Sequence, residues 1–156
     1  MPARARVPSA SPADSHVGVL DFLRQLWAVD HALQRRSKRM LRERGITGPQ
    51  RLALRLLLLQ PGMSAGDLAA AMHVHPSTLT GVLERLERSK LLLRKARPGD
   101  QRSVELRATA KGAAIVRETR GTVEDAVRRS LARHTTRELA IARTVLSELE
   151  SELLGR

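Results

Sequence analysis

Apolar residues recur at three- and four-residue intervals along most of this chain, and that spacing constrains the fold more than any other feature. Such a period is typical of helices that bury one face. It predicts a first helix from about residue 17 to 44, which Gly45 ends. Further helices are expected to start at Thr47 or Gly48, at Ser64, at Ser77, at Thr109 or Ala110, and at Thr135. The fifth of these six helices should run unbroken to Arg133.

Two of these helices, from Ser64 to Met72 and from Ser77 to about Ser89, are separated only by a short turn. The second has an apolar stripe, and its opposite face is small and polar. A helix-turn-helix needs that combination, because small residues let the second helix approach base edges closely. An ordinary helical hairpin is the alternative. The expected DNA contacts on this helix are Ser77, Thr78, Thr80, Gly81, Arg85 and Arg88.

A hairpin is predicted directly after these two helices. Residues 91–95 have the length of a strand, and residues 103–107 alternate apolar with polar side chains. The turn sequence Arg97-Pro98-Gly99-Asp100 lies between them. A helix-turn-helix followed by a hairpin with a basic tip is the winged variant, in which Arg97 and Arg102 would reach into a minor groove. Asp100 would either orient Arg102 or serve only as a turn residue.

Charge and composition limit the classes of partner that this chain could bind. The 28 Lys and Arg residues against 16 Asp and Glu give a net charge of +12, which indicates an anionic partner. Aromatic platforms for single-stranded nucleic acid are not expected, because Phe22 and Trp27 are the only Phe, Tyr or Trp residues. No apolar run approaches the roughly 18–20 residues that span a bilayer. We therefore expect double-stranded DNA as the partner, no membrane contact, and a cytoplasmic location.

The last predicted helix has an apolar stripe for which a small winged-helix core offers no partner. The first helix likewise has apolar residues without a packing partner in that core. We therefore expect a homodimer that buries these residues, with packing inside one chain as the alternative. The residues expected at the dimer contact are Leu20, Leu23, Leu146, Leu149 and Leu153. The basic run from Arg35 to Arg44 is either a solvated face or part of the field that attracts DNA.

The expected fold class is mainly α with a small β-hairpin wing, in a winged helix-turn-helix that dimerisation helices flank on both sides. Residues 1–14 are expected to form a disordered basic arm, and residues 15–156 a single domain. Within that domain, the winged helix-turn-helix should cover about 46–109, and the dimerisation helices about 17–44 and 110–154.

The chain from about Gly45 to Gly112 resembles the MarR (multiple antibiotic resistance regulator) family. The similar segments are Gly45-Ile46-Thr47, Ser64-Ala65-Gly66-Asp67-Leu68-Ala69, Pro76-Ser77-Thr78-Leu79-Thr80, Leu83-Glu84-Arg85-Leu86-Glu87-Arg88, Asp100-Gln101-Arg102-Ser103-Val104 and Thr109-Ala110-Lys111-Gly112. The wing pattern, at a fixed distance after the recognition helix, is the most specific part. Ser64 is also among the expected DNA contacts. The long flanking helices fit the family's dimerisation region as well.

The resemblance implies a triangular winged-helix dimer whose N- and C-terminal helices interlock. It implies binding to a pseudo-palindromic operator, mostly for repression, which ends when a small anionic or aromatic molecule binds between the dimer region and the DNA-binding lobe. A regulator without an effector, or an architectural DNA-binding protein, is the alternative. An RNA-binding protein is disfavoured by the scarcity of aromatic residues.

Three positions depart from the family pattern. Gly81 stands where many relatives have Arg, so base reading should depend more on Thr80, Arg85 and Arg88. Lys90 stands where relatives have the glycine that ends the recognition helix, which indicates a left-handed backbone there. Ala108 replaces a common Leu.

Candidate ligand-binding residues are Trp27 and His31 in the first helix and Arg51 and Arg55 in the second. Trp27 would line a pocket or pack in the dimer core. Arg51 and Arg55 would bind a ligand carboxylate or form salt bridges to Asp or Glu.

No other chemistry is expected. His73 and His75 lie two residues apart in a turn, and they lack the further ligands that a zinc site needs. The chain has no cysteine, so disulfides, thiolate metal sites and thiol redox sensing are excluded. We predict no enzymatic activity, no cofactor and no metal.

Overall fold

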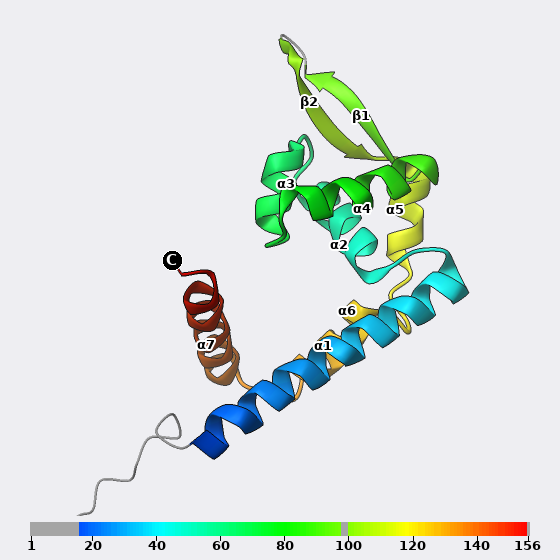
Figure 1. Cartoon of the computed structure of the whole chain (residues 1–156). Coiled ribbons are helices and arrows are strands. Elements are labelled where there is room, and N and C mark those ends of the chain that lie inside the picture. Colours follow the sequence, from blue (N-terminus) through cyan, green and yellow to red (C-terminus); the bar gives the residue numbers. More distant parts are fainter. Residues whose placement is uncertain (1–15, 98–99, 156) are drawn as a thin grey trace, which may run out of the picture.

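The computed structural model describes the backbone of residues 16–97 and 100–155 and the side chains of residues 18–96 and 104–155. The expected arm over residues 1–14 lies outside this part. The elements are α1 (His16–Arg44), α2 (Gly48–Leu59), α3 (Ala65–Ala71), α4 (Pro76–Arg88), β1 (Leu92–Arg97), β2 (Asp100–Ala108), α5 (Ala110–Arg117), α6 (Val123–Leu131) and α7 (Thr136–Leu154). The fold is mainly α with one antiparallel hairpin, as expected (Figure 1).

Three helices begin with a reciprocal capping box, in which a Thr or Ser hydroxyl accepts from the backbone N–H three residues later and that residue's side chain accepts in return. Two of these boxes start α3 and α7, at the helix starts that the sequence predicts. A third box starts α2, where the first turn also tolerates Pro49. The three pairs are Thr47 with Gln50, Ser64 with Asp67, and Thr135 with Glu138.

One hydrophobic core joins α2, α3, α4, α5 and the hairpin into a compact lobe. Its fully buried side chains include Leu54 of α2, Leu83 and Leu86 of α4, and Leu106 of β2. The backbone of α5 passes very close to this core, because a Cβ on Gly112 would lie 2.1 Å from the carbonyl oxygen of Leu91. Glycine at position 112 therefore allows α5 to pack against the lobe.

The hairpin is longer than the sequence predicted. β1 and β2 pair antiparallel from Leu92 opposite Ala108 to Arg97 opposite Asp100, with an irregularity after Ala96. The N–H of Leu106 also donates to the carbonyl oxygen of Met63 at 2.8 Å, which ties the base of the hairpin to the segment before α3. The hairpin thus projects from the lobe beside α4 (Figure 1).

The expected unbroken helix from about residue 110 to 133 is wrong, because the chain forms α5 and α6 with a turn between them. Gly121 has a φ of 74°, and Thr122 then caps α6 by accepting from the N–H of Asp125. The glycine and the capping threonine outweigh the apolar repeat that runs through this segment.

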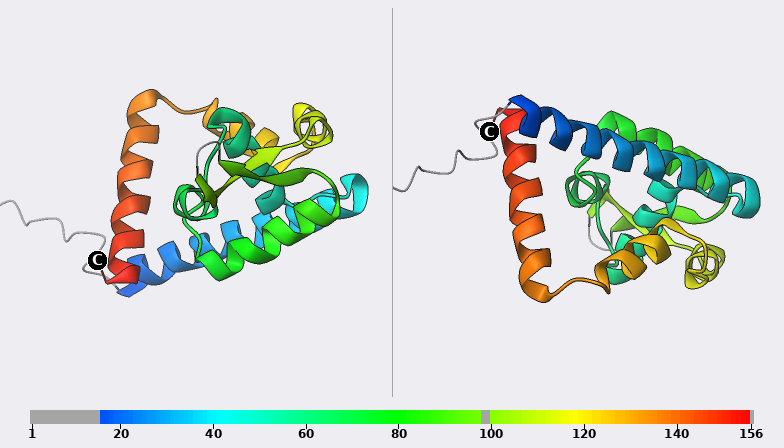
Figure 2. Two further views of the ribbon diagram at one scale, coloured as in Figure 1. Left: turned by 90° about the horizontal axis from the view of Figure 1, so that it is seen from above. Right: turned by 90° about the horizontal axis from the view of Figure 1, so that it is seen from below.

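α1 and α7 extend beyond the lobe. The second half of α1 packs on it, and Met40 is only 1% exposed. α7 has no buried residue, and it reaches the lobe through Glu150, whose carboxylate lies 3.0 Å from Nδ1 of His73 in the turn between α3 and α4. Figures 1 and 2 show the rest of α7 projecting away from the lobe. The exposed apolar residues on these two helices include Leu20, Phe22 and Trp27 of α1 and Leu146 and Leu153 of α7.

Candidate nucleic-acid interface

α4 presents a continuous polar face to solvent. Leu79, Leu83 and Leu86 are buried against the lobe, so the side chains on the other side of the helix point outward. Of the six expected DNA contacts on this helix, five are exposed on that side, and the sixth, Gly81, is half-buried. The exposed five are Ser77, Thr78, Thr80, Arg85 and Arg88.

The start of α4 is fixed by a residue that the sequence reasoning did not assign. His75 is the N-cap, and its Nδ1 accepts from the N–H of Ser77 at 3.3 Å and lies 2.8 Å from the Ser77 hydroxyl. The signal was available, since His75 directly precedes Pro76 at the first helical position. Thr80 donates its hydroxyl to the carbonyl oxygen of Pro76 at 3.0 Å.

Ser64 is the N-cap of α3, the helix before α4. The Ser64 hydroxyl accepts from the N–H of Asp67 at 3.1 Å and donates to its carboxylate at 2.8 Å. Both hydrogen bonds cap α3. A DNA contact by Ser64 would share a hydroxyl that already has two partners inside the chain.

The hairpin is held to α4 by an ion pair of 2.7 Å between Arg94 of β1 and Glu87 of α4. This contact couples the direction of the hairpin to that of α4. The side chains of Arg97, Asp100 and Arg102 lie outside the described residues, so their roles at the tip of the wing stay predictions. The backbone pairing of Arg97 with Asp100 places all three at the end of the hairpin.

The end of α4 confirms the prediction for Lys90. Its φ of 58° is left-handed, and its N–H donates to the carbonyl oxygen of Glu87 at 2.8 Å. A non-glycine residue in this region is strained. The Thr109 hydroxyl donates to the Lys90 carbonyl oxygen at 2.9 Å, which holds the turn against the start of α5.

The four candidate ligand residues do not come together. Trp27 is 68% exposed, and His31 lies on α1 beside a cluster of arginines. Arg51 is fully buried and donates to Glu124 and to the carbonyl oxygens of Ile115 and Val116, at 2.7–2.8 Å. The Arg51 guanidinium therefore binds partners within the chain. For this residue the structure shows the salt bridge, which is the alternative to binding a ligand carboxylate.

Arg55 lies beside the same carboxylate. Its Nε is 3.7 Å from Glu124 and has no hydrogen-bond partner among the described residues. Arg51 and Arg55 therefore share Glu124, and His31 lines a separate concavity on α1.

A different set of residues lines a large groove between α1, α2 and α6, with a volume of about 1020 Å³. Its walls are mostly apolar, with Asp30, Lys38, Glu124 and Arg128 among the polar residues. The sequence reasoning missed this groove, although its apolar residues fall on the helix stripes that lack partners. They include Leu33, Leu52, Met72, Val74, Val123, Val127 and Leu131.

The described part of the chain contains no cluster of three or more His, Cys, Asp or Glu residues that could hold a metal ion. None of its helices is long and apolar enough to cross a membrane.

The fold and the exposed helix face define a winged helix-turn-helix. The model of the MarR family matches residues 46–104. An HTH-type transcriptional repressor of Mycobacterium tuberculosis is 31% identical over 127 residues, which cover 81% of this chain and 91% of the relative. The homoprotocatechuate degradative operon repressor of Escherichia coli is 29% identical over 109 residues, which cover 70% and 74%. The chain belongs to the MarR family.

Solved structures share this fold. The S. aureus MepR–DNA complex has a TM-score of 0.71 at 22% identity, and the match covers 85% of this chain and 97% of MepR. The Streptomyces coelicolor regulator PcaV, in complex with its natural ligand, has a TM-score of 0.64 at 22% identity, and the match covers 93% and 98%. The overall fold of these solved regulators is thus present in this chain, from α1 to α7.

Proposed function

We propose that this protein is a dimeric transcriptional repressor that binds a pseudo-palindromic operator and releases it when a small ligand binds. The observation that supports DNA binding most strongly is the exposed face of α4. Its small residues allow close approach to base edges, and Arg85 and Arg88 offer donors for bases or phosphates. The proposal places the protein in the cytoplasm with the DNA, and it includes no enzymatic activity.

The dimer follows from the exposed apolar residues of α1 and α7. Leu146 and Leu153 are exposed in a single chain, as is Leu20. A second copy would bury them and would set two α4 helices on one face of a duplex. Replacing Leu149 and Leu153 with Glu should produce monomers with weak operator binding, measured by light scattering and fluorescence anisotropy. A wild-type protein that is monomeric in solution would refute the dimer.

The groove between α1, α2 and α6 supports the ligand response. It lies between the long helix α1 and the lobe, and its apolar walls suit an aromatic molecule with one or two polar groups. The named relatives include a repressor of an aromatic degradation operon and a structure with a natural ligand. A ligand that favours another spacing of the two lobes would weaken operator binding by its differential affinity, typically about 5–150-fold.

The decisive experiment is selection of bound genomic fragments by the purified protein. The expected result is an inverted repeat whose half-sites are about 10 base pairs apart. Phenolic acids and similar anions are then screened for melting shifts and for release of that operator. Selection without any enriched motif would reject sequence-specific binding. Compounds that bind but never change operator affinity would leave a regulator without an effector.

A further inference from the structure

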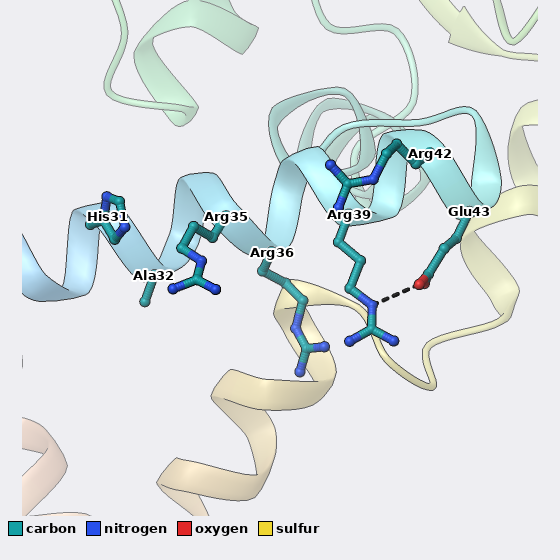
Figure 3. Close-up of a pocket in the computed structure, with 7 residues that line it drawn as sticks. All are labelled: His31, Ala32, Arg35, Arg36, Arg39, Arg42 and Glu43. Carbon is teal, nitrogen blue, oxygen red and sulfur yellow. Dashed lines mark hydrogen bonds and ion pairs between the residues drawn. The ribbon is translucent and has the colours of Figure 1, made fainter.

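The second half of α1 has a row of arginines on one face. Arg35, Arg39 and Arg42 follow His31 at steps of three and four residues, and Arg36 lies beside them. Together these residues line a shallow concavity of about 560 Å³ (Figure 3). We call Arg35, Arg36, Arg39 and Arg42 the arginine stripe.

Most of the stripe lacks an intramolecular counter-ion. Arg39 pairs with Glu43 at 2.6 Å, and this hydrogen bond lowers the pKa of Glu43 below its usual value. No carboxylate in the described part of the chain forms an ion pair with Arg35, Arg36 or Arg42. Like charges four residues apart destabilise a helix, so the stripe is unfavourable for folding of the free chain.

Three of the four arginines lie away from the side of α1 that packs on the lobe. Met40 and Leu33 lie on that side, whereas Arg35 and Arg42 are about 140–200° and Arg39 about 100° away from Met40 around the helix. Arg36 is only about 40° away from Met40 and is half-buried. Figure 3 shows Arg35, Arg36 and Arg39 extending away from the faint green helices of the lobe. DNA that contacts α4 therefore does not reach Arg35 and Arg42.

The dimer contact also leaves the stripe uncovered. Apart from Leu41, the exposed apolar residues of α1 lie between Val19 and Leu33, in the first part of the helix. A two-fold contact built there does not extend over the arginines. A self-contact across the stripe would bring eight guanidinium groups together and would repel.

From these observations we propose that the arginine stripe is a second DNA-binding surface, which contacts the phosphate backbone of another duplex. This inference rests on the proposed function. If the operator occupies α4 and a second duplex occupies α1, one dimer bridges two DNA segments, which is an architectural role added to regulation.

Double-stranded DNA fits the stripe better than a small anion does. From Arg35 to Arg42 the stripe is about 10 Å long, and a duplex presents on the order of six phosphates over that length. Each guanidinium can bind a phosphate with two parallel hydrogen bonds. Among the residues of the concavity, none is Phe, Tyr or Trp, so the stacking that single strands require is missing.

The test is a bridging assay with the full-length dimer. Operator DNA is fixed on beads and saturated with protein, and capture of a fluorescent duplex of unrelated sequence is measured. Wild-type protein should capture it. The variant Arg35→Gln/Arg36→Gln/Arg42→Gln should capture at least about tenfold less, and the slope of log affinity against log salt for the second duplex should fall by about three. Operator affinity, measured separately by anisotropy, should change less than about threefold.

A matched control removes the same charge elsewhere. Arg117, Arg133 and Arg137 are exposed on the described surface and lie outside the stripe, so Arg117→Gln/Arg133→Gln/Arg137→Gln should bridge like wild type. If the triple stripe variant is unfolded by circular dichroism, Arg42→Gln alone should still lower capture. Duplex RNA and single-stranded DNA of equal length serve as competitors.

The outcomes separate the two proposals. Absence of operator binding in the anisotropy titration would reject the proposed function. Normal operator binding with no capture of a second duplex would overturn the bridging inference alone. So would equal capture by wild type and stripe variant, or a preference for RNA over DNA.

Discussion

Arg51 of α2 and Glu124 of α6 form an ion pair of 2.7 Å that joins the lobe to the helices beyond it. The same guanidinium binds the last carbonyl oxygens of α5, at Ile115 and Val116. One buried side chain thus fixes the end of α5 and the start of α6 at once. Glu124 also lines the groove between α1, α2 and α6, so a ligand there would lie next to this connection.

Arg51→Met should lower the free energy of unfolding by about 3 kcal/mol, because it leaves Glu124 and two carbonyl oxygens without their donor. Urea unfolding monitored by circular dichroism measures this change. Arg55→Met is the matched control, since Arg55 is partly exposed and 3.7 Å from the same carboxylate. Its effect should stay below about 1 kcal/mol. Equal unfolding midpoints for the two variants would contradict the bridging role of Arg51.

Lys90→Gly should raise the unfolding free energy by up to about 1 kcal/mol, because glycine adopts the left-handed backbone at φ 58° without strain. The extra freedom of glycine in the unfolded chain offsets part of this gain. Ser89→Gly is the control, because Ser89 has a φ of −82° and should lose stability instead. A destabilised Lys90→Gly would mean that the Lys90 side chain has a stabilising partner.

The sequence predicted the local features of the fold well. The stripe of Leu79, Leu83 and Leu86 is buried, and the capping pair of Ser64 with Asp67 starts α3. Such features depend on neighbours within four residues, so the helical period and the cap chemistry suffice to find them. The break between α5 and α6 was missed because the apolar repeat was given more weight than Gly121.

Contacts between distant residues were not predictable in the same way. Arg51 binds carbonyl oxygens 64 and 65 residues later in the chain, and nothing in its own segment indicates them. The groove needs Leu33, Leu52 and Val127 from three separate helices. Only the packing of α1, α2 and α6 brings these together, so the sequence identified arginines and a tryptophan as ligand residues instead.

Asp125 should make stability depend on pH below about 4. A hydrogen bond from the N–H of Gly121, and then the guanidiniums of Arg128 and Arg129, lower the pKa of this carboxyl to about 2. In the unfolded chain the pKa is near 3.8. The unfolded state thus takes up a proton first as pH falls, and the contribution is complete above pH 4 and lost toward pH 2.

Asp125→Asn is expected to unfold at lower urea concentration than wild type at pH 7, with a difference that shrinks as the pH falls below about 4. Urea titrations at several pH values measure this. Asp21→Asn, at an exposed carboxylate on α1, controls for the loss of one negative charge. A difference that stays constant from pH 7 to pH 3 would show that the Asp125 carboxyl is not stabilised in its ionised form.

Gly81→Ala separates stability from DNA binding. A Cβ at this position of α4 meets no atom within 4 Å, so alanine should stabilise the helix by up to about 1 kcal/mol. If the small residue serves close approach to DNA, the added methyl group should weaken operator binding by about 1–3 kcal/mol. Thermal melting and anisotropy titrations measure the two changes independently. A variant that is more stable and binds the operator with unchanged affinity would show that this face of α4 does not come close to the bases. Arg88→Ala in the same titrations should alter the preference among operator variants, also by about 1–3 kcal/mol, because it removes a donor rather than adding bulk.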